Sequence, residues 1–234
     1  MRSAAIIGLM FAPIGMQAAE FQLPAGCNAY LTVHDASCQV DHHFRCEGDA
    51  EGIQRRVTLS EDGMTFMGQI DPETQWIESF HALSGHTEVL ESNPADPASF
   101  SALIATGDDD FDLYTSSKEI GRTRYIGNDH LTGRTVEIDG VTLEETAYAL
   151  TAYSPEGVEQ WTVQGNEFIS RDWRMFLSGP GVVTTPTEKF EKDGTPVEFI
   201  FPGEAGFLTT KPKHGCGVMM SQAPELQEYS NDHI

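Results

Sequence analysis

A run of acidic and hydroxyl residues at positions 108–119 has the spacing of a calcium-binding loop. If Asp108 is position 1, oxygen-bearing side chains occupy positions 1, 3, 5 and 9, and Glu119 occupies position 12. An EF-hand loop takes its ligands from these positions but needs glycine at position 6, where this chain has Leu113. The alternative is an acidic turn that leads into a strand, because runs of charge are usually solvated. The candidate calcium ligands are Asp108, Asp110, Asp112 and Glu119.

A second group of candidate ligands consists of histidines near cysteines. Imidazole nitrogen and thiolate sulfur bind zinc and copper, and a link between Cys46 and Cys216 would bring His42, His43 and His214 together. Neighbouring residues of a strand point to opposite faces, so at most one of the two adjacent histidines could serve a given site. Oxidation of the cysteines to a disulfide explains the same residues without a metal.

No motif with a catalytic mechanism is present. The sequence has no Gly-x-Ser-x-Gly elbow, no His-Glu-x-x-His helix and no phosphate-binding loop. Carboxylates are abundant, and a curved acidic sheet will place some pair at the separation that a glycosidase uses. We therefore assign no catalytic residue, no cofactor-binding residue and no cofactor. A hydrolase with dispersed histidine and carboxylate groups remains an alternative.

The N-terminus predicts export. Arg2 precedes an uncharged, mostly apolar run at 4–16 and the small residues Ala18 and Ala19, the order of a secretory signal peptide over residues 1–19. The run is about half of the roughly 20 residues that span a bilayer, so we expect no transmembrane anchor in the mature form. The Ala-Gly-Cys ending at Cys27 also fits a lipoprotein cleavage site. The expected location is periplasmic or secreted.

The cysteine count supports an oxidising compartment. An even number of cysteines in an exported chain favours two disulfides, and one of them must join the two ends of the chain if all four pair. We expect Cys27 to pair with Cys38 and Cys46 with Cys216.

The charge balance argues against two kinds of partner. The chain has 14 Lys and Arg residues against 36 Asp and Glu residues, a formal net charge of −22. Nucleic acid binding depends on basic side chains that meet phosphates, and anionic membrane surfaces also attract basic patches, so neither partner is expected. A soluble, self-repelling surface is the simplest interpretation.

Short apolar alternations separated by turn residues predict an all-β fold. Asp139-Gly140 and Pro155-Glu156-Gly157 are typical of turns between antiparallel strands. We expect one domain at 20–220, an antiparallel meander of about a dozen strands curled into a barrel or half-barrel, and a disordered tail at 221–234. Asp96 as N-cap, Pro97 at N1 and Gly107 as C-cap predict one short helix near 97–106.

An internal similarity predicts two further hairpins. Residues 76–87 and 125–135 share the order aromatic, Ile, His, Leu, hydroxyl, Gly and Thr. The first copy also fits a helix, whereas the second continues into an alternating strand. We interpret both as hairpins that turn at Ser84-Gly85 and at Thr132-Gly133.

Aromatic residues are the main indication of function. In a curled sheet they either fill the core or line a cavity for an apolar small molecule or lipid. The architecture alone is similar to that of periplasmic lipoprotein carriers, although no residue motif is shared. We therefore expect a non-enzymatic binding or carrier protein for an apolar ligand or an envelope protein, with a scaffold without ligand as a further alternative. The candidate cavity residues are Trp76, Tyr125, Trp161 and Trp173.

Overall fold

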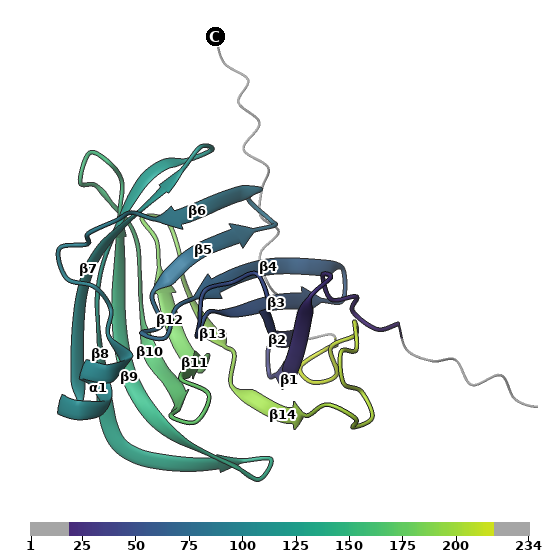
Figure 1. The fold of residues 1–234 in the computed structure, drawn as a ribbon. Coiled ribbons are helices and arrows are strands. Elements are labelled where there is room, and N and C mark those ends of the chain that lie inside the picture. Colours follow the sequence, from purple (N-terminus) through teal and green to yellow (C-terminus); the bar gives the residue numbers. More distant parts are fainter. Residues whose placement is uncertain (1–18, 218–234) are drawn as a thin grey trace, which may run out of the picture.

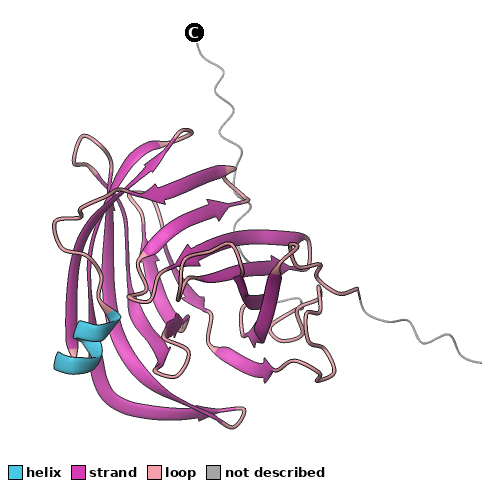
Figure 2. Cartoon of the chain, in the orientation of Figure 1, coloured by secondary structure: helices cyan, strands magenta, loops and turns pink. Residues whose placement is uncertain are grey.

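A computed structural model describes residues 19–217, so the predicted signal peptide, apart from Ala19, and the predicted tail lie outside the described residues. The fold is a single antiparallel sheet of 14 strands with one short helix, curled into a half-barrel as predicted (Figure 1, Figure 2). The strands are β1 Cys27–Asp35, β2 Val40–Cys46, β3 Gln54–Ser60, β4 Gly63–Ile70, β5 Trp76–His81, β6 His86–Leu90, β7 Asp108–Ser117, β8 Gly121–Ile138, β9 Val141–Tyr153, β10 Glu159–Ser170, β11 Met175–Leu177, β12 Pro180–Thr184, β13 Lys189–Asp193 and β14 Pro196–Ile200.

Strands β1 to β10 pair in chain order, so most of the sheet is a meander. The turn between β8 and β9 shows why. Asp139 and Gly140 both have positive φ, 47° and 76°, as a two-residue type I′ hairpin turn requires. The predicted turns at Ser84-Gly85 and at Ser154 to Gly157 also connect neighbouring strands. Local turn chemistry therefore accounts for the order of the strands.

The two edges of the sheet are consecutive in the chain. Strand β13 lies at one end of the strand order and β14 at the other, and only residues 194 and 195 separate them. Three residue steps span at most about 11 Å. The sheet must therefore curl until its edges nearly meet, although β13 and β14 do not pair with each other. This curl produces the enclosed face on which the candidate site lies.

Helix α1, Phe100–Thr106, begins later than predicted. Ser99 is the N-cap and accepts a hydrogen bond from Ala102, and Gly107 is the C-cap with φ of 91°, as predicted. Asp96 is not the cap, because its backbone is used in an isolated bridge to Asp112 of β7. The backbone bridge between Asp96 and Asp112 therefore explains why the helix begins after the predicted start.

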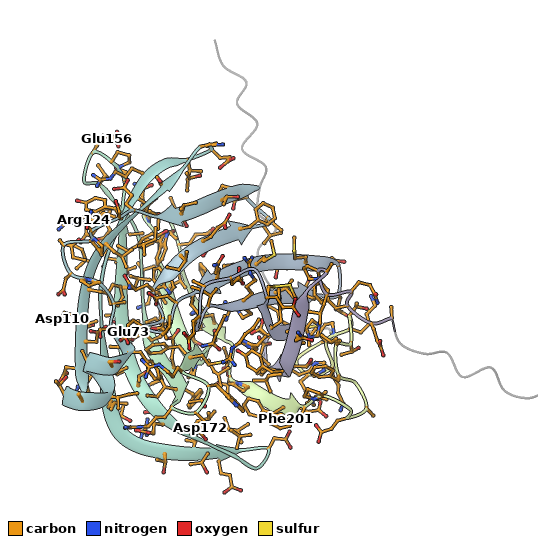
Figure 3. All side chains as sticks on the ribbon, in the orientation of Figure 1. Glu73, Asp110, Arg124, Glu156, Asp172 and Phe201 are labelled. Atoms are coloured by element: carbon orange, nitrogen blue, oxygen red, sulfur yellow. A yellow bond between two sulfur atoms is a disulfide. The ribbon has the colours of Figure 1, made fainter. Side chains whose placement is uncertain are left out.

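Glu73 fixes the position of α1 (Figure 3). Its carboxylate accepts hydrogen bonds from the Ser99 hydroxyl, the Ser101 hydroxyl and the Ser101 amide, and it forms an ion pair with Arg174 at 3.0 Å. A negative charge is favourable at a helix N-terminus. The helix is thus tied to the β4–β5 and β10–β11 connections.

The predicted turn at Thr132-Gly133 is wrong. Both residues lie inside β8, where the register with β9 shifts between Leu131 and Thr135. The extra residues form a bulge, which bends a strand without reversing it. The shared pattern of 76–87 and 125–135 therefore describes a hairpin in the first copy and a bent strand in the second.

Both disulfides are present, but the predicted pairing is wrong. Cys27 pairs with Cys46, and Cys38 pairs with Cys216. Cys27 and Cys46 face each other across the β1–β2 ladder, whereas Cys38 lies in the turn at the other end of that hairpin. Strand β1 is roughly 30 Å long at 3.3 Å per residue, so Cys27 cannot reach Cys38. The disulfide at Cys27 also leaves its sulfur no free valence for a lipid.

The two disulfides are typical of proteins in oxidising compartments. Within residues 19–217, no helix has the length and apolar character needed to cross a membrane.

We predict that the long-range disulfide contributes more to stability than the short-range one. The chain-entropy model assigns about 5 kcal/mol to a loop of the length closed by Cys38–Cys216 and about 3 kcal/mol to that closed by Cys27–Cys46. The double variants Cys38→Ser/Cys216→Ser and Cys27→Ser/Cys46→Ser should therefore unfold at lower urea concentrations than the parent, the first more so. Equal midpoints for the parent and the first variant would contradict this assignment.

Candidate functional site

A cavity of about 350 Å³ lies inside the curl of the sheet, lined by side chains from strands β2 to β11. Its walls are mixed in character. Aromatic and aliphatic groups dominate at β7 to β9, while titratable and amide groups come from β2, β3, β5, β6, β8 and β10. We call this space the inner cavity. Its size is at the lower end of the range of small-molecule sites.

Four aromatic side chains form one wall of the inner cavity. The ring centroids of Trp76 and Phe111 are 6.0 Å apart, those of Trp76 and Tyr125 are 5.5 Å apart, and those of Tyr125 and Trp161 are 6.0 Å apart. Edge-to-face and tilted pairs of this kind stabilise each other beyond their buried area. The cluster is thus a rigid apolar surface.

Glycines allow two of the large rings to lie against the sheet. Phe111 is directly opposite Gly127, where a Cβ atom would overlap the Phe111 ring. Tyr148 is directly opposite Gly165, which is itself packed against the backbone of β12. A larger residue at either glycine would push a ring or a strand away. These glycines therefore set the shape of the cavity.

Two carboxyl groups and a phenol form the polar wall. Asp129 and Tyr148 are directly opposite each other on β8 and β9, and Glu167 follows Gly165 by two positions on the same face of β10. Burial raises the pKa of Asp129 to about 8, and the carboxyls of Glu167 and Asp109 raise it too. Burial also raises the pKa of Glu167 to about 7, against the charges of Lys192 and Arg56. Both side chains remain partly exposed because they face the cavity.

Two polar atoms at the inner cavity are buried without a hydrogen-bond partner among residues 19–217. They are Nε2 of His43, a residue only 5% exposed, and the hydroxyl of Tyr148. Burial lowers the pKa of His43 to about 4, so the ring is neutral at pH 7. A buried polar atom without a hydrogen bond costs about 1–3 kcal/mol. An occupant that forms hydrogen bonds would remove this cost.

Other polar groups at the inner cavity are already engaged. Gln54 donates to the backbone oxygens of Trp173 and Arg174 at 2.9 and 3.1 Å. The Arg56 guanidinium lies 4.8 Å from the Phe66 ring centroid and 3.8 Å from a carboxylate oxygen of Asp41. These groups support the wall, whereas the buried polar atoms of His43 and Tyr148 have no hydrogen-bond partner within residues 19–217.

The predicted cavity residues are mostly in place. Trp76, Tyr125 and Trp161 line the inner cavity. Trp173 does not, because it packs against Phe199, 5.7 Å away between ring centroids, in a separate core cluster. Three of the four aromatic candidates therefore meet in one wall.

The predicted calcium ligands lie along an extended strand and its following turn. Asp108, Asp110 and Asp112 alternate on the outer face of β7, where successive side chains of one face are about 6.6–6.8 Å apart. Figure 3 labels Asp110 among them. Asp112 is paired with Arg124 and Asp108 with His130, while Glu119 accepts from the Ser117 hydroxyl. The structure gives the acidic strand that was the alternative interpretation and does not bring these four side chains together.

The predicted transition-metal ligands are also separated. His42 and His43 lie on opposite faces of β2, as expected, and His42 stacks on Phe21 while it contacts the Thr209 backbone oxygen at 3.1 Å. His214 contacts Glu198 and His34 instead. Both cysteine pairs are disulfides, so no described thiolate is free.

Sequence reasoning did not identify Asp129, Tyr148 and Glu167 as a group. One pattern in the sequence could have indicated Asp129. Tyr125, Gly127 and Asp129 alternate along one strand and therefore share a face, so if Tyr125 points into the sheet interior, the Asp129 carboxyl does too.

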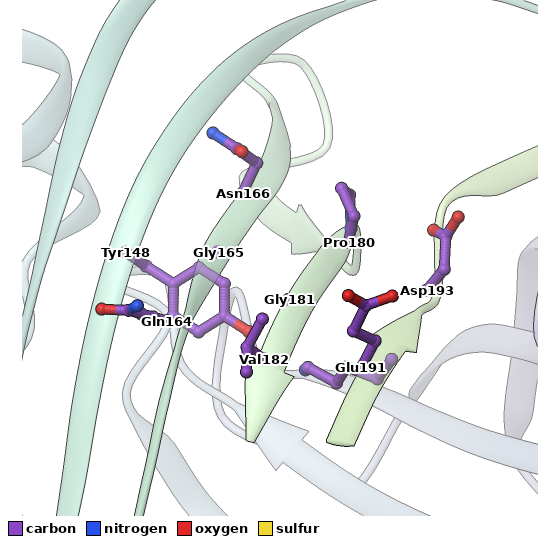
Figure 4. A pocket seen from close by; sticks show the side chains of 10 residues that line it. Tyr148, Gln164, Gly165, Asn166, Pro180, Gly181, Val182, Glu191 and Asp193 are labelled. Atoms are coloured by element: carbon purple, nitrogen blue, oxygen red, sulfur yellow. The ribbon is translucent and has the colours of Figure 1, made fainter. Parts of the chain in front are cut away.

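A second, wider hollow of about 740 Å³ lies over β10, β12 and β13 (Figure 4). It is lined by glycines, Tyr148 and side chains of the exposed strand β13. It contains no aromatic cluster comparable with that of the inner cavity, so we take the inner cavity as the candidate site.

Comparisons with protein-family models, with curated proteins and with solved structures found no match to this chain.

We predict that the stabilising contribution of Asp129 and Glu167 falls as pH rises from about 4 to about 8. The folded chain binds the protons of Asp129 and Glu167 more tightly than the unfolded chain, so this stabilising contribution is complete below pH 4 and is lost towards pH 8. Asp129→Asn should raise the free energy of unfolding at pH 8 by on the order of 1–3 kcal/mol and leave it nearly unchanged at pH 4. Urea unfolding at both pH values measures this.

The matched control is Asp110→Asn, which removes the same charge from an exposed position on β7. A gain that is equal in both variants, or equal at both pH values, would show that Asp129 is not protonated in the folded chain.

Proposed function

We propose that this protein binds and carries a small amphipathic molecule in the inner cavity. The observation that carries the proposal is a wall of packed aromatic rings facing a wall with unpartnered buried polar atoms, Nε2 of His43 and the hydroxyl of Tyr148. The aromatic wall suits an apolar body. The polar wall suits a head group that forms hydrogen bonds.

The charge state of the polar wall favours a neutral head group. With a pKa of about 8, the Asp129 carboxyl keeps its proton at pH 7 and can donate a hydrogen bond. His43 is neutral there and can accept one at Nε2 if Nδ1 carries the proton. A hydroxyl or amide group on the ligand can form hydrogen bonds with both Asp129 and His43, and its burial does not require a charge to leave water.

The predicted export is consistent with a carrier role outside the cytoplasm. The predicted signal peptide and the two disulfides favour an oxidising compartment. The acidic surface does not favour nucleic acid or anionic membranes as partners. The proposal therefore concerns a periplasmic or secreted protein and a small molecule rather than a charged polymer.

A hydrolase is the second candidate, favoured by the coupled carboxyls of Asp129 and Glu167. A carboxyl that is neutral at pH 7 beside a second one is an arrangement that general acid catalysis uses. Release of a cleaved product from the bound molecule would favour this function over carriage.

The direct test is a native intact-mass spectrum of the protein purified gently from its own cell, beside a denatured spectrum of the same sample. We expect extra mass in the native spectrum alone, in the range of a small organic molecule. A bare chain under native conditions would count against a retained ligand.

We predict that Leu150→Trp weakens binding of the fluorescent probe N-phenyl-1-naphthylamine by about tenfold or more. Leu150 lines the inner cavity, so a larger ring there occupies the space that the probe needs. Direct excitation of the probe measures its affinity, and circular dichroism confirms the fold. The control is Leu83→Trp, the same change at a residue that is 90% exposed in the β5–β6 turn. Equal affinity in both variants would place the probe elsewhere.

A further inference from the structure

Two histidines and a glutamate converge on the inner face of the β5–β6 hairpin. His81 and His86 are directly opposite each other in the ladder, and Glu88 follows His86 by two positions, so all three side chains share one face. The imidazole rings are stacked with centroids 4.7 Å apart. Both Nε2 atoms point at the same carboxylate oxygen, Oε2 of Glu88, at 3.5 and 3.7 Å.

These separations are unusual for hydrogen bonds and typical of metal ligands. A contact of 3.5–3.7 Å is at or beyond the outer limit of a hydrogen bond between nitrogen and oxygen. Two ligands at about 2.0–2.1 Å from a tetrahedral zinc ion are about 3.3 Å apart. The three ligand atoms lie within 4.8 Å of one another, so a single ion can reach them all after small side-chain movements.

The surroundings hold two of the three ligands, Glu88 and His86, in position. Oε1 of Glu88 accepts hydrogen bonds from the hydroxyls of Thr115 at 2.6 Å and Tyr125 at 2.9 Å. Nδ1 of His86 lies 2.7 Å from the Ser84 hydroxyl, which leaves its Nε2 directed towards Glu88. Partners of this kind orient the ligands in metal sites and fix the histidine tautomer.

The charge of Glu88 is not neutralised by a lysine or arginine among the described residues. Its side chain is 7% exposed, and within residues 19–217 no lysine or arginine forms an ion pair with it. A buried carboxylate needs a compensating charge. A divalent cation supplies this positive charge, so the stacked imidazole rings of His81 and His86 need not be protonated.

The geometry points to a divalent transition-metal site formed by His81, His86 and Glu88, with zinc as the best-fitting ion. Two imidazoles and one carboxylate are a ligand set that suits zinc, and three protein ligands leave one coordination position open. His81 and Glu88 both line the inner cavity, so the open position faces it. This inference does not rest on the proposed carrier function.

The test uses the full mature chain without an affinity tag, stripped with EDTA and then titrated with zinc chloride by calorimetry. We expect one zinc ion per chain. His86→Ala should weaken binding by about 100-fold or more because it removes a ligand. Ser84→Ala should weaken it by about tenfold because it removes only the group that orients His86. His130→Ala, at an exposed histidine paired with Asp108, is the control and should bind as the parent does.

Cobalt(II) titration gives a second readout that does not depend on variants. A tetrahedral cobalt site with nitrogen and oxygen ligands has visible absorption bands, and zinc should displace them. Circular dichroism shows whether His86→Ala is folded. If this variant is unfolded, zinc binding by Ser84→Ala and the cobalt spectrum of the parent decide whether the site exists. Absence of saturable zinc binding by the parent, or equal losses in His86→Ala and His130→Ala, would overturn the site. The N-phenyl-1-naphthylamine titration is done in EDTA and therefore without bound metal. The carrier proposal and the metal-site proposal can then fail independently of each other.

Discussion

The near-closure of the sheet is the constraint on which the rest of the structure depends. Strands β13 and β14 lie at opposite edges but are joined by two residues, so the end of β13 and the start of β14 cannot be more than about 11 Å apart. A sheet of 14 strands held in this way has one enclosed face. The side chains on that face must either fill the interior or line a cavity, and here they do both. The Cys38–Cys216 disulfide adds a covalent link between the β1–β2 turn and the end of the described chain.

Local physics made much of this fold predictable. Alternating apolar residues gave the strands, and residues that accept positive φ, such as Asp139-Gly140, gave the turns. The failures were all nonlocal. Whether Thr132-Gly133 reverses the chain or bulges depends on the pairing of β8 with β9. The partner of Cys27 depends on the register of β1 with β2, which no spacing in the sequence specifies.

The candidate site was less predictable than the fold because acidic residues are abundant throughout the sequence. Aromatic residues are few, so Trp76, Tyr125 and Trp161 stood out and proved to lie together. Acidic residues are abundant, so nothing marked Asp129 and Glu167 among 36 carboxylates. What distinguishes these two is their position on an otherwise apolar face. That property requires the face of each strand to be known, and a one-residue shift in register would reverse it.

The inner cavity has features that stability alone does not explain. A sheet that needed only a solid core would gain more from apolar side chains at the positions of His43, Asp129 and Glu167, because each buried polar group without a partner opposes folding. Protonation reduces the cost for the two acids, and neutrality reduces it for His43, but neither gives Nε2 a hydrogen bond. The same reasoning applies to Glu88, whose buried charge lies beside two histidines and has no lysine or arginine partner within residues 19–217. Burial of the polar wall and burial of Glu88 both become favourable once an occupant supplies the missing hydrogen bonds or charge. The aromatic wall gives that occupant an apolar surface.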